Sequence, residues 1–202
     1  NPFVLGMPEF VQTLLDSLTS KAQDPSQWRS RQRSHVVPRH AGGGAVDVSM
    51  GALSWTPDRE RNVLLSSPYA SALPVVVVAE GSPACDARNL GELTIAAVRH
   101  TSVVPLLRAL PRPPRIAYVR TLSQGIAALE RGRVDGVASD DLLLDAVSPA
   151  GASAWRRIPL TLNRQWYCAA VAPHREGLLH EVDAAIREVL GPGRTSASAD
   201  SI

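Results

Sequence analysis

The amino-acid sequence predicts an α/β protein in which a mainly parallel β-sheet is flanked by helices. Three observations predict this fold class. Between residues 73 and 147, segments of strand character alternate with segments of helical character, a pattern typical of βαβ units. The run LPVVVVAEG at 73–81 is continuous and β-branched, which favours a strand covered on both faces. The segment EGLLHEVDAAIREVL at 176–190 has the periodicity of an amphipathic helix.

The part of the chain before this alternation is expected to begin with a helix over residues 8–22. Its apolar residues recur at helical spacing, and they are Phe10, Val11, Leu14, Leu15 and Leu18. Pro8 and Glu9 suit a first helical turn. Residues 23–44 are polar, basic and glycine-rich, which predicts a loop that leads into a strand at VDVSMGAL, residues 46–53.

The alternating part predicts the remaining elements in order. NLGELTIAAV predicts a short helix and then a strand. Helices are expected in SVVPLLRAL, TLSQGIAALERGR and LLLDAVS, and strands in RIAYV and VDGVASDD. YCAAVAPH predicts one more strand before the closing helix. The tail over residues 191–202 is rich in Ser, Ala and Gly and is expected to be disordered.

Composition and charge exclude several classes of function. The 21 basic and 19 acidic residues are interspersed, so we expect neither a nucleic acid nor a membrane surface as a partner. No window approaches the roughly 18 apolar residues that span a bilayer, and a signal peptide is expected to be absent or already removed. The five histidines show no metal-ligand spacing, and no phosphate-binding loop is present. We therefore expect neither a metal nor a cofactor.

Several segments, taken in order, resemble the bacterial extracellular solute-binding protein family 3, which comprises receptors for polar amino acids in ABC importers. The most specific segment is SWTPDR at 54–59, followed by SSPY at 66–69. These are similar to the family's Thr-Ile-Thr-Pro-Glu-Arg and Phe-Ser-Asp-Pro-Tyr. The resemblance runs from Val46 to Val189 and includes NLGELTIAAVRHTS, ALERGRVDGVASDD and the last strand and helix.

The resemblance implies a periplasmic-binding-protein-like fold of two lobes, joined by two crossing strands, with a ligand cleft between them. Residues 1–71 and 165–190 would form lobe 1, and residues 72–164 would form lobe 2. The family's first strand, which precedes a Pro-Phe pair, is missing if Pro2 and Phe3 are that pair. Lobe 1 is therefore either incomplete at its N-terminus or completed by another segment.

The two cysteines, Cys85 and Cys168, could form a disulfide outside the cytoplasm or could be two small buried side chains. The implied topology places them in different lobes. Because a disulfide would tether lobes that must move, we expect two free buried thiols.

In lobe 1 the resemblance implies three ligand contacts from the first motif. Arg59 would bind the ligand α-carboxylate through a bidentate contact, and the Ser54 hydroxyl would help to hold the same ligand. Ala52 stands where the family has a glycine whose backbone carbonyl accepts a hydrogen bond from the ligand ammonium. Alanine has the same backbone carbonyl, so this contact remains available. The alternative for Arg59 is a solvated side chain at a helix start.

In lobe 2 the resemblance implies that Asp140 pairs with the ligand ammonium. The alternative is that Asp140 caps a helix, although Asp141 could be that cap instead. Thr101 and Ser102 match a loop that donates backbone N–H groups to the carboxylate at a helix start. Arg99 and His100 replace a small residue and a glycine, and a longer acidic ligand is one interpretation of this departure.

Four tryptophans are candidates for an aromatic ligand wall, although aromatic side chains more often lie in the core. They are Trp28, Trp55, Trp155 and Trp166. Trp166 and the adjacent Tyr167 lie near the second crossing strand and are the preferred candidates.

These features predict a monomeric binding protein that captures an amino acid or a related zwitterion for an ABC permease. It would be extracellular or periplasmic, either free or lipid-anchored, and would not be an enzyme. One alternative is a dehydratase of the same fold, a cytoplasmic lyase in which His100, Asp140 or Asp141 acts as acid or base. Another is a ligand-sensing domain of a larger receptor.

Overall fold

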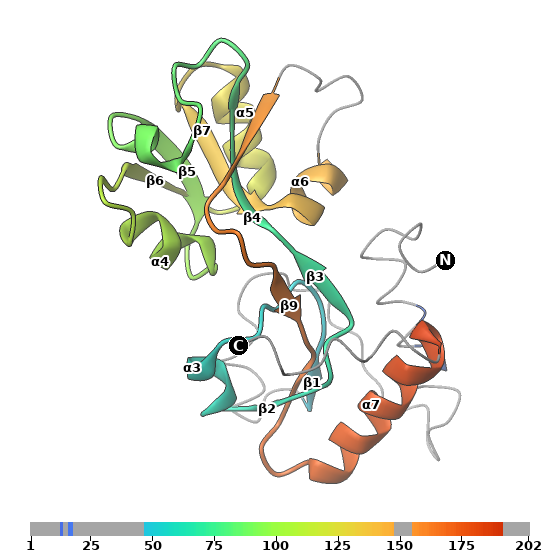
Figure 1. Ribbon diagram of the computed structural model, residues 1–202. Helices are drawn as coiled ribbons and strands as arrows, with labels where there is room; N and C mark the ends of the chain where they lie inside the picture. Colours follow the sequence, from blue (N-terminus) through green and yellow to red (C-terminus); the bar gives the residue numbers. More distant parts are fainter. Residues whose placement is uncertain (1–12, 14–15, 18–46, 148–154, 192–202) are drawn as a thin grey trace. The chain divides into compact units, whose positions relative to one another are not determined.

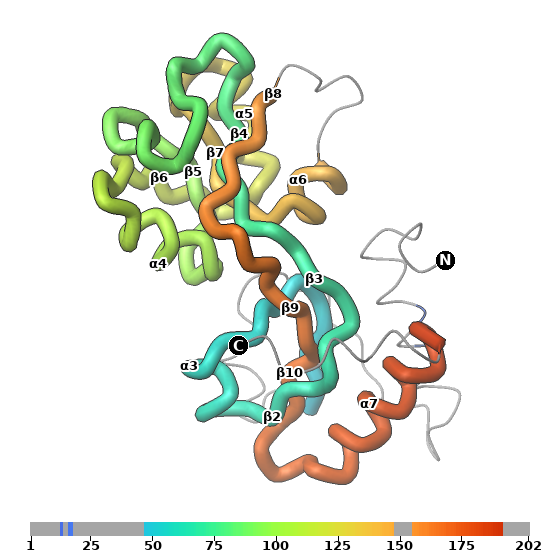
Figure 2. The backbone as a smooth tube through the Cα atoms, viewed as in Figure 1, coloured from blue at the N-terminus to red at the C-terminus, as the bar shows by residue number. Residues whose placement is uncertain are grey.

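The computed structural model describes residues 13, 16, 17, 47–147 and 155–191, and the chain divides into two compact units (Figure 1). Unit 1 comprises the chain up to Ser71 and from Trp166 onward, and unit 2 comprises Ala72–Gln165. The chain leaves unit 1 through β3 (Ala70–Ala72) and returns through β9 (Gln165–Tyr167). These two strands pair with each other (Figure 2).

Unit 2 contains a five-stranded sheet in the order β6-β5-β7-β4-β8. The strands are β4 (Pro74–Ala79), β5 (Thr94–Val98), β6 (Arg115–Val119), β7 (Gly136–Asp140) and β8 (Trp155–Pro159). β5 is parallel to β6 and β7, whereas β4 is antiparallel to both of its neighbours. β5, β6, β7 and β8 therefore run in one direction, so this sheet is mainly parallel as expected, and β4 alone is reversed. β4 and β8 carry the chain into and out of unit 2, whereas β5, β6 and β7 are linked by crossover helices.

The helices of unit 2 cover both faces of this sheet. They are η2 (Ala87–Leu90), α4 (Val103–Arg108), α5 (Leu122–Glu130) and α6 (Asp141–Val147). On one face, Val76 and Val78 pack in the same core cluster as Leu107 of α4. On the other face, Val75 and Val77 pack with apolar residues of α5 and α6. The prediction that the valine run is covered on both faces is confirmed.

Unit 1 contains a three-stranded antiparallel sheet in the order β1-β10-β2. The strands are β1 (Val48–Ser49), β2 (Leu64–Leu65) and β10 (Ala170–Val171), and the helices are α3 (Pro57–Glu60) and α7 (Glu176–Leu190). The expected mainly parallel sheet is therefore wrong for the described part of this unit. β10 lies between β1 and β2 and is antiparallel to both, and the single strand expected in YCAAVAPH is divided into β9 and β10. The closing helix, α7, is confirmed over its whole predicted length.

Several predicted elements lie largely outside the described residues. Of the helix expected over 8–22, only Thr13, Asp16 and Ser17 are described, and all three are helical. The Ser17 hydroxyl lies 3.4 Å from a carboxylate oxygen of Glu188 in α7. The loop over 23–44, the Pro2-Phe3 pair, Trp28 and nearly all of the tail are outside the description. None of the described helices is both long and apolar enough to cross a membrane.

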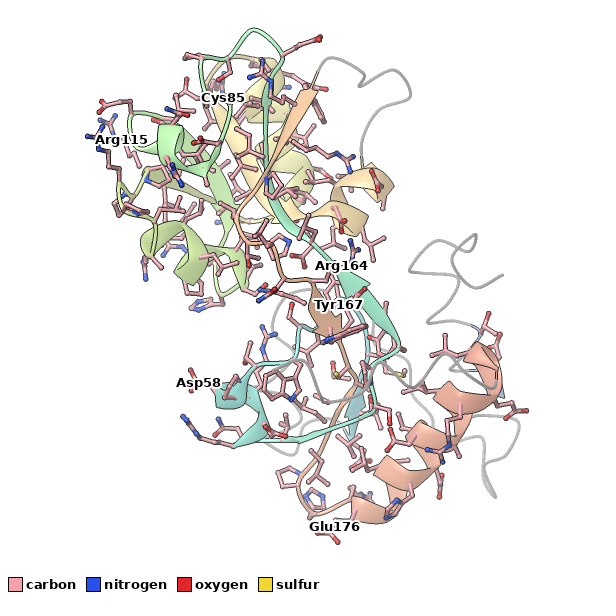
Figure 3. All side chains as sticks on the ribbon, in the orientation of Figure 1. Asp58, Cys85, Arg115, Arg164, Tyr167 and Glu176 are labelled. Carbon is pink, nitrogen blue, oxygen red and sulfur yellow. The ribbon has the colours of Figure 1, made fainter. Side chains whose placement is uncertain are left out.

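Both cysteines are free thiols, but only one is buried. Cys168 is 2% exposed, whereas Cys85 is exposed in the loop after β4 (Figure 3). The expectation of two buried thiols is therefore wrong for Cys85, because the neighbouring Ala84 takes the buried position in this loop. Burial raises the pKa of the Cys168 thiol to about 12, with smaller contributions from the negative charges of Asp183 and Glu60.

Two leucines of unit 2 provide a matched test of the core. Leu107 is fully buried, whereas Leu162 is 95% exposed. We expect Leu107→Ala to lower the free energy of unfolding by about 2–5 kcal/mol, because it removes buried contacts and leaves a cavity. Leu162→Ala is expected to change it by no more than about 0.5 kcal/mol. Denaturant unfolding followed by circular dichroism measures both, and equal losses would contradict this packing.

The two thiols should differ in reactivity, because the thiolate is the nucleophile and Cys168 is both buried and of raised pKa. We expect a disulfide reagent at pH 8 to label Cys85 rapidly in the folded protein and Cys168 only after denaturation. Peptide mass spectrometry identifies the labelled residue. In the control, Cys85→Ser should abolish rapid labelling. Labelling of folded Cys168 at the rate of Cys85 would contradict its placement.

Candidate functional site

In unit 1, a capped turn positions Arg59 at the start of α3. Thr56 has extended backbone angles, and its side-chain oxygen accepts a hydrogen bond from the backbone N–H of Arg59 at 3.3 Å. Pro57 follows at the first helical position, where its missing N–H is not needed. The Thr-Pro pair therefore starts the helix and fixes the backbone that carries Arg59.

The Arg59 side chain turns back towards the strand before this turn. It is half-buried, and its Nη1 donates a hydrogen bond to the backbone carbonyl of Ser54. By contrast, Arg61 is exposed and forms an ion pair with exposed Asp58 at 2.8 Å. Arg61 therefore has the features of a solvated helix arginine, and Arg59 does not.

Ser54 and β9 bring the predicted aromatic residues next to this turn. Ser54 is 2% exposed and forms an antiparallel bridge with Tyr167. The backbone N–H of Trp55 donates to the carbonyl of Trp166 at 2.7 Å. The Trp166 side chain is 42% exposed, whereas Tyr167 is fully buried. Unit 1 thus brings together Ser54, Arg59, Trp166 and Tyr167, with Trp166 the more accessible of the two aromatic side chains.

Tyr69 fixes the loop that carries Ala52. The Tyr69 hydroxyl donates to the carbonyl of Gly51 and accepts from the N–H of Gly51 at 3.1 Å. Gly51 has a positive φ of 152°, which favours glycine, and Ala52 next to it is exposed. Burial raises the pKa of Tyr69, so the phenol stays protonated and remains a donor. Sequence reasoning identified the Ser-Pro-Tyr motif but missed this contact.

In unit 2, the predicted site residues follow the carboxyl ends of neighbouring parallel strands. β5 and β6 pair Val98 with Val119, and β5 and β7 pair Ala97 with Ala138. Arg99 directly follows β5, which lies between β6 and β7 in the sheet. Continuing the register by one or two residues therefore places Arg99 between Arg120, which follows β6, and Asp140, which ends β7. Ligands of α/β sheets commonly bind at this edge.

The loop after β5 leads into α4. The Thr101 hydroxyl donates to the carbonyl of Val98 at 2.7 Å, and Ser102 is the residue before the first turn of α4. His100 has a positive φ of 62°. This left-handed conformation favours glycine, and histidine adopts it more readily than most residues. His100 therefore keeps the backbone conformation that a glycine would adopt there.

The adjacent aspartates at the end of β7 have different environments. Asp140 is 6% exposed and is the last residue of the strand. Asp141 begins α6, and its Oδ1 accepts from the N–H of Leu142 at 2.8 Å and from that of Leu73 at 2.9 Å. Asp141 therefore lies in the first turn of α6, and the alternative role of Asp140 as the helix cap stays a prediction.

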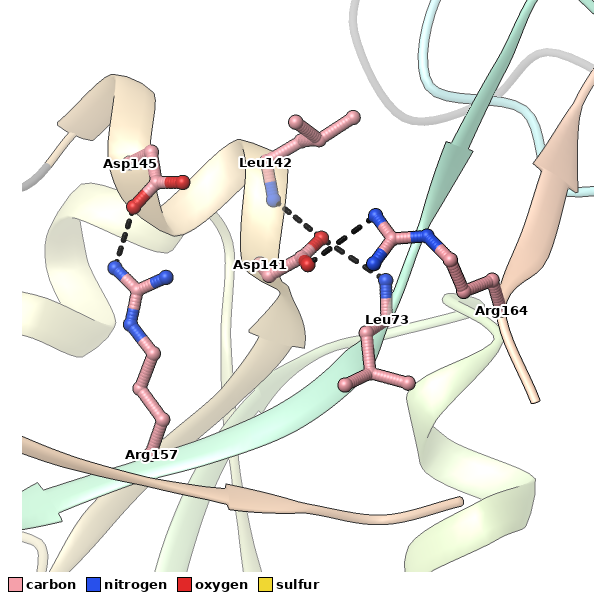
Figure 4. A network of polar contacts seen from close by, with 6 residues as sticks. All are labelled: Leu73, Asp141, Leu142, Asp145, Arg157 and Arg164. Carbon is pink, nitrogen blue, oxygen red and sulfur yellow. Dashed lines mark hydrogen bonds and ion pairs between the residues drawn. The ribbon is translucent and has the colours of Figure 1, made fainter. Parts of the chain in front are cut away.

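Asp141 also binds the segment that leads back towards β9. Its Oδ2 lies 3.3 Å from Nη2 of Arg164, and both side chains appear in Figure 4 with Leu73. Asp141 is therefore bonded to both segments that connect with unit 1, through Leu73 and Arg164. A second ion pair nearby joins Asp145 of α6 to Arg157 of β8. Sequence reasoning found the aspartate doublet but missed Leu73 and Arg164.

The histidines that the structure describes lie on the surface. His100, His174 and His180 are exposed, whereas His35 and His40 lie outside the described residues. Within the described parts of the chain, no group of three or more His, Cys, Asp or Glu side chains could hold a metal ion. Of the acid–base candidates, Asp141 is engaged by two backbone N–H groups and Arg164.

Comparisons with known proteins agree on the family and the fold. The family described as bacterial extracellular solute-binding proteins, family 3, matches residues 13–199. The substrate-binding protein of an amino acid ABC transporter has a TM-score of 0.78 at 19% identity, over 92% of this chain and 83% of that chain. Holo ArgBP from T. maritima has a TM-score of 0.77 at 19% identity, over 90% of this chain and 80% of that chain.

An ancestral arginine-binding protein bound to glutamine has a TM-score of 0.75 at 19% identity, over 92% of this chain and 81% of that chain. A search of curated proteins found no match. At these identities the structural likeness shows the fold, and the predicted fold class is confirmed.

The role of Asp141 can be tested against Asp145, which lies on the same helix. We expect Asp141→Ala to lower the free energy of unfolding by about 1–3 kcal/mol, because the N–H groups of Leu73 and Leu142 lose their acceptor. Asp145→Ala removes only an exposed ion pair and is expected to cost at most about 1 kcal/mol. Thermal and denaturant unfolding measure both variants. An Asp141 variant as stable as the parent would contradict this role.

Proposed function

Because the chain belongs to the bacterial extracellular solute-binding proteins, family 3, we propose that it captures an amino acid or a related small zwitterion. Such a ligand carries a carboxylate and an ammonium. Removing either charge from water costs several kcal/mol unless an opposite charge replaces the lost hydration. The proposal therefore assigns each ligand charge to a residue of opposite sign.

Arg59 is assigned to the ligand carboxylate, and its position is the observation that carries the proposal. The guanidinium is half-buried and is held beside the buried Ser54 rather than extended into solvent. An arginine in this setting can present a fork of N–H donors to a carboxylate. The Ser54 hydroxyl, the Ala52 carbonyl and the exposed Trp166 ring complete the contacts proposed for unit 1.

Asp140 is assigned to the ligand ammonium. Its carboxylate is almost fully buried at the strand edge that also carries Thr101 and Ser102. The adjacent Asp141 binds the backbone N–H groups of Leu73 and Leu142 and forms the ion pair with Arg164. Backbone N–H groups at Thr101 and Ser102 are proposed to add hydrogen bonds to the ligand carboxylate.

The biological role proposed for this binding is delivery of the ligand to an ABC permease. Membership in a family of extracellular solute-binding proteins supports an extracellular or periplasmic location. The two chain crossings through β3 and β9 suit a hinge, and ligand binding would then shift the population towards a closed form. We propose that the protein acts as a monomer.

Isothermal titration with a panel of natural amino acids tests the proposal. We expect at least one to bind, and Arg59→Ala to weaken its binding about tenfold or more, because a charge-assisted contact is lost. Arg61→Ala is the matched control, since Arg61 lies two residues further along, at the C-cap of the same helix, and is exposed. Its affinity should equal that of the parent. No binding by the folded parent, or equal binding by Arg59→Ala, would overturn the proposal.

Asp140 is tested in the same titration by Asp140→Asn, which keeps the shape of the side chain but removes its charge. We expect a loss of affinity of about tenfold or more. Asp145→Asn is the control, because Asp145 is exposed and pairs with Arg157. Circular dichroism establishes that each variant is folded. If Asp140→Asn is folded and binds like the parent, Asp140 does not bind the ammonium.

A further inference from the structure

Three side chains of unit 2 form a contact group that the family resemblance does not assign, which we call the Tyr118 cluster. It consists of Arg99, Arg108 and Tyr118. The Arg99 guanidinium carbon lies 4.1 Å from the centre of the Tyr118 ring. The Tyr118 hydroxyl lies 2.7 Å from Nη2 of Arg108, which donates to it. One half-buried tyrosine thus holds two exposed arginines from different elements.

The strand register places the Arg99 end of this cluster at the edge that carries the proposed ligand residues. Tyr118 pairs with Ala97 in the parallel β5–β6 ladder, and Arg99 follows Ala97 by two residues. Arg99 therefore lies on the same sheet face as Tyr118, at the carboxyl end of β5. Thr101 and Ser102 follow in the chain after His100, and Asp140 ends the neighbouring strand β7.

The cluster presents hydrogen-bond donors rather than acceptors. Stacking on an aromatic face fixes the plane of a guanidinium while its N–H edge can still bind an anion. Tyr118 accepts a hydrogen bond from Arg108, so the Tyr118 O–H proton can be donated elsewhere. A carboxylate, which only accepts, complements this set of donors, and Arg binds carboxylates in a bidentate manner.

Charge at this edge favours the same class of ligand. Arg120 follows β6 beside Arg99, so two cations lie on the β5–β6 side of Asp140 along the register. A second cation on the ligand would be repelled by these arginines, whereas a second carboxylate would be attracted.

We propose that Arg99, positioned by Tyr118 and Arg108, binds a second carboxylate and makes the protein selective for acidic ligands such as glutamate or aspartate. This inference rests on the proposed function, in which Arg59 and Asp140 bind the α-carboxylate and the ammonium. Arg99 is the specificity residue, whereas Tyr118 and Arg108 orient it.

Titration of the parent with glutamate, glutamine and arginine tests the selectivity. Glutamine is nearly isosteric with glutamate and lacks the second charge. We expect glutamate to bind about tenfold or more tightly than glutamine, and arginine to bind most weakly. Added salt should weaken glutamate binding more than glutamine binding, because ions screen the attraction between charges.

Variants of the cluster test the residues themselves. We expect Arg99→Gln to weaken glutamate binding about tenfold or more while changing glutamine binding little. Tyr118→Leu removes the aromatic ring on which Arg99 stacks, so it should weaken glutamate binding more than glutamine binding. Tyr118→Phe keeps the ring and should retain more of the preference for glutamate over glutamine. Arg131→Gln is the control, since Arg131 is an exposed arginine at the end of α5, ahead of β7.

The outcomes separate this inference from the proposed function. Binding of glutamine or arginine as tightly as glutamate, with sensitivity to Arg59→Ala, would overturn the acidic selectivity and leave the proposed function standing. An unchanged glutamate preference in folded Arg99→Gln would also overturn it. If the folded parent binds no amino acid, both fail.

Discussion

The cost of removing a charge from water governs what this protein can bind. A zwitterion can be desolvated only where each of its charges meets an opposite charge or several hydrogen bonds. Unit 1 offers a half-buried guanidinium at Arg59, and unit 2 offers a buried carboxylate at Asp140. Contacts within each unit hold the backbone next to these residues.

Backbone hydrogen bonds perform much of this support. In unit 1, Thr56 caps the helix that carries Arg59, and Tyr69 holds the neighbouring loop at Gly51. In unit 2, Asp141 accepts the backbone N–H groups of Leu73 and Leu142, which stabilises the junction directly after Asp140. Each residue that we propose to bind the ligand thus lies close in the chain to a residue that binds the backbone.

The alternation of strands and helices in unit 2 was predictable because amphipathic and buried segments differ in period. The reversed direction of β4 was not predictable from the sequence. A strand covered on both faces has the same apolar run whether its neighbours are parallel or antiparallel. In unit 1, β1, β2 and β10 have two residues each and are too short to show a period. The exposed Cys85 was missed because sequence does not reveal which residue of a loop turns inward.

For the site, the sequence indicated residue types and spacing, but long-range contacts needed the fold. Thr56, Pro57 and Arg59 lie in one short motif and were recognisable together. The contacts of Asp141 with Leu73 and Arg164, and of Tyr118 with Arg99, join positions far apart in the chain. A backbone N–H acceptor or a stacking partner leaves no pattern in the sequence.

The central claim concerns recognition of both charges of one ligand, and chemical changes in the ligand test it most directly. Calorimetric titration of the parent would compare its tightest-binding amino acid with the α-carboxamide and the N-acetyl derivative of that amino acid. The account predicts that each derivative binds about tenfold or more weakly, because each removes one charge. Undiminished binding of either derivative would contradict it.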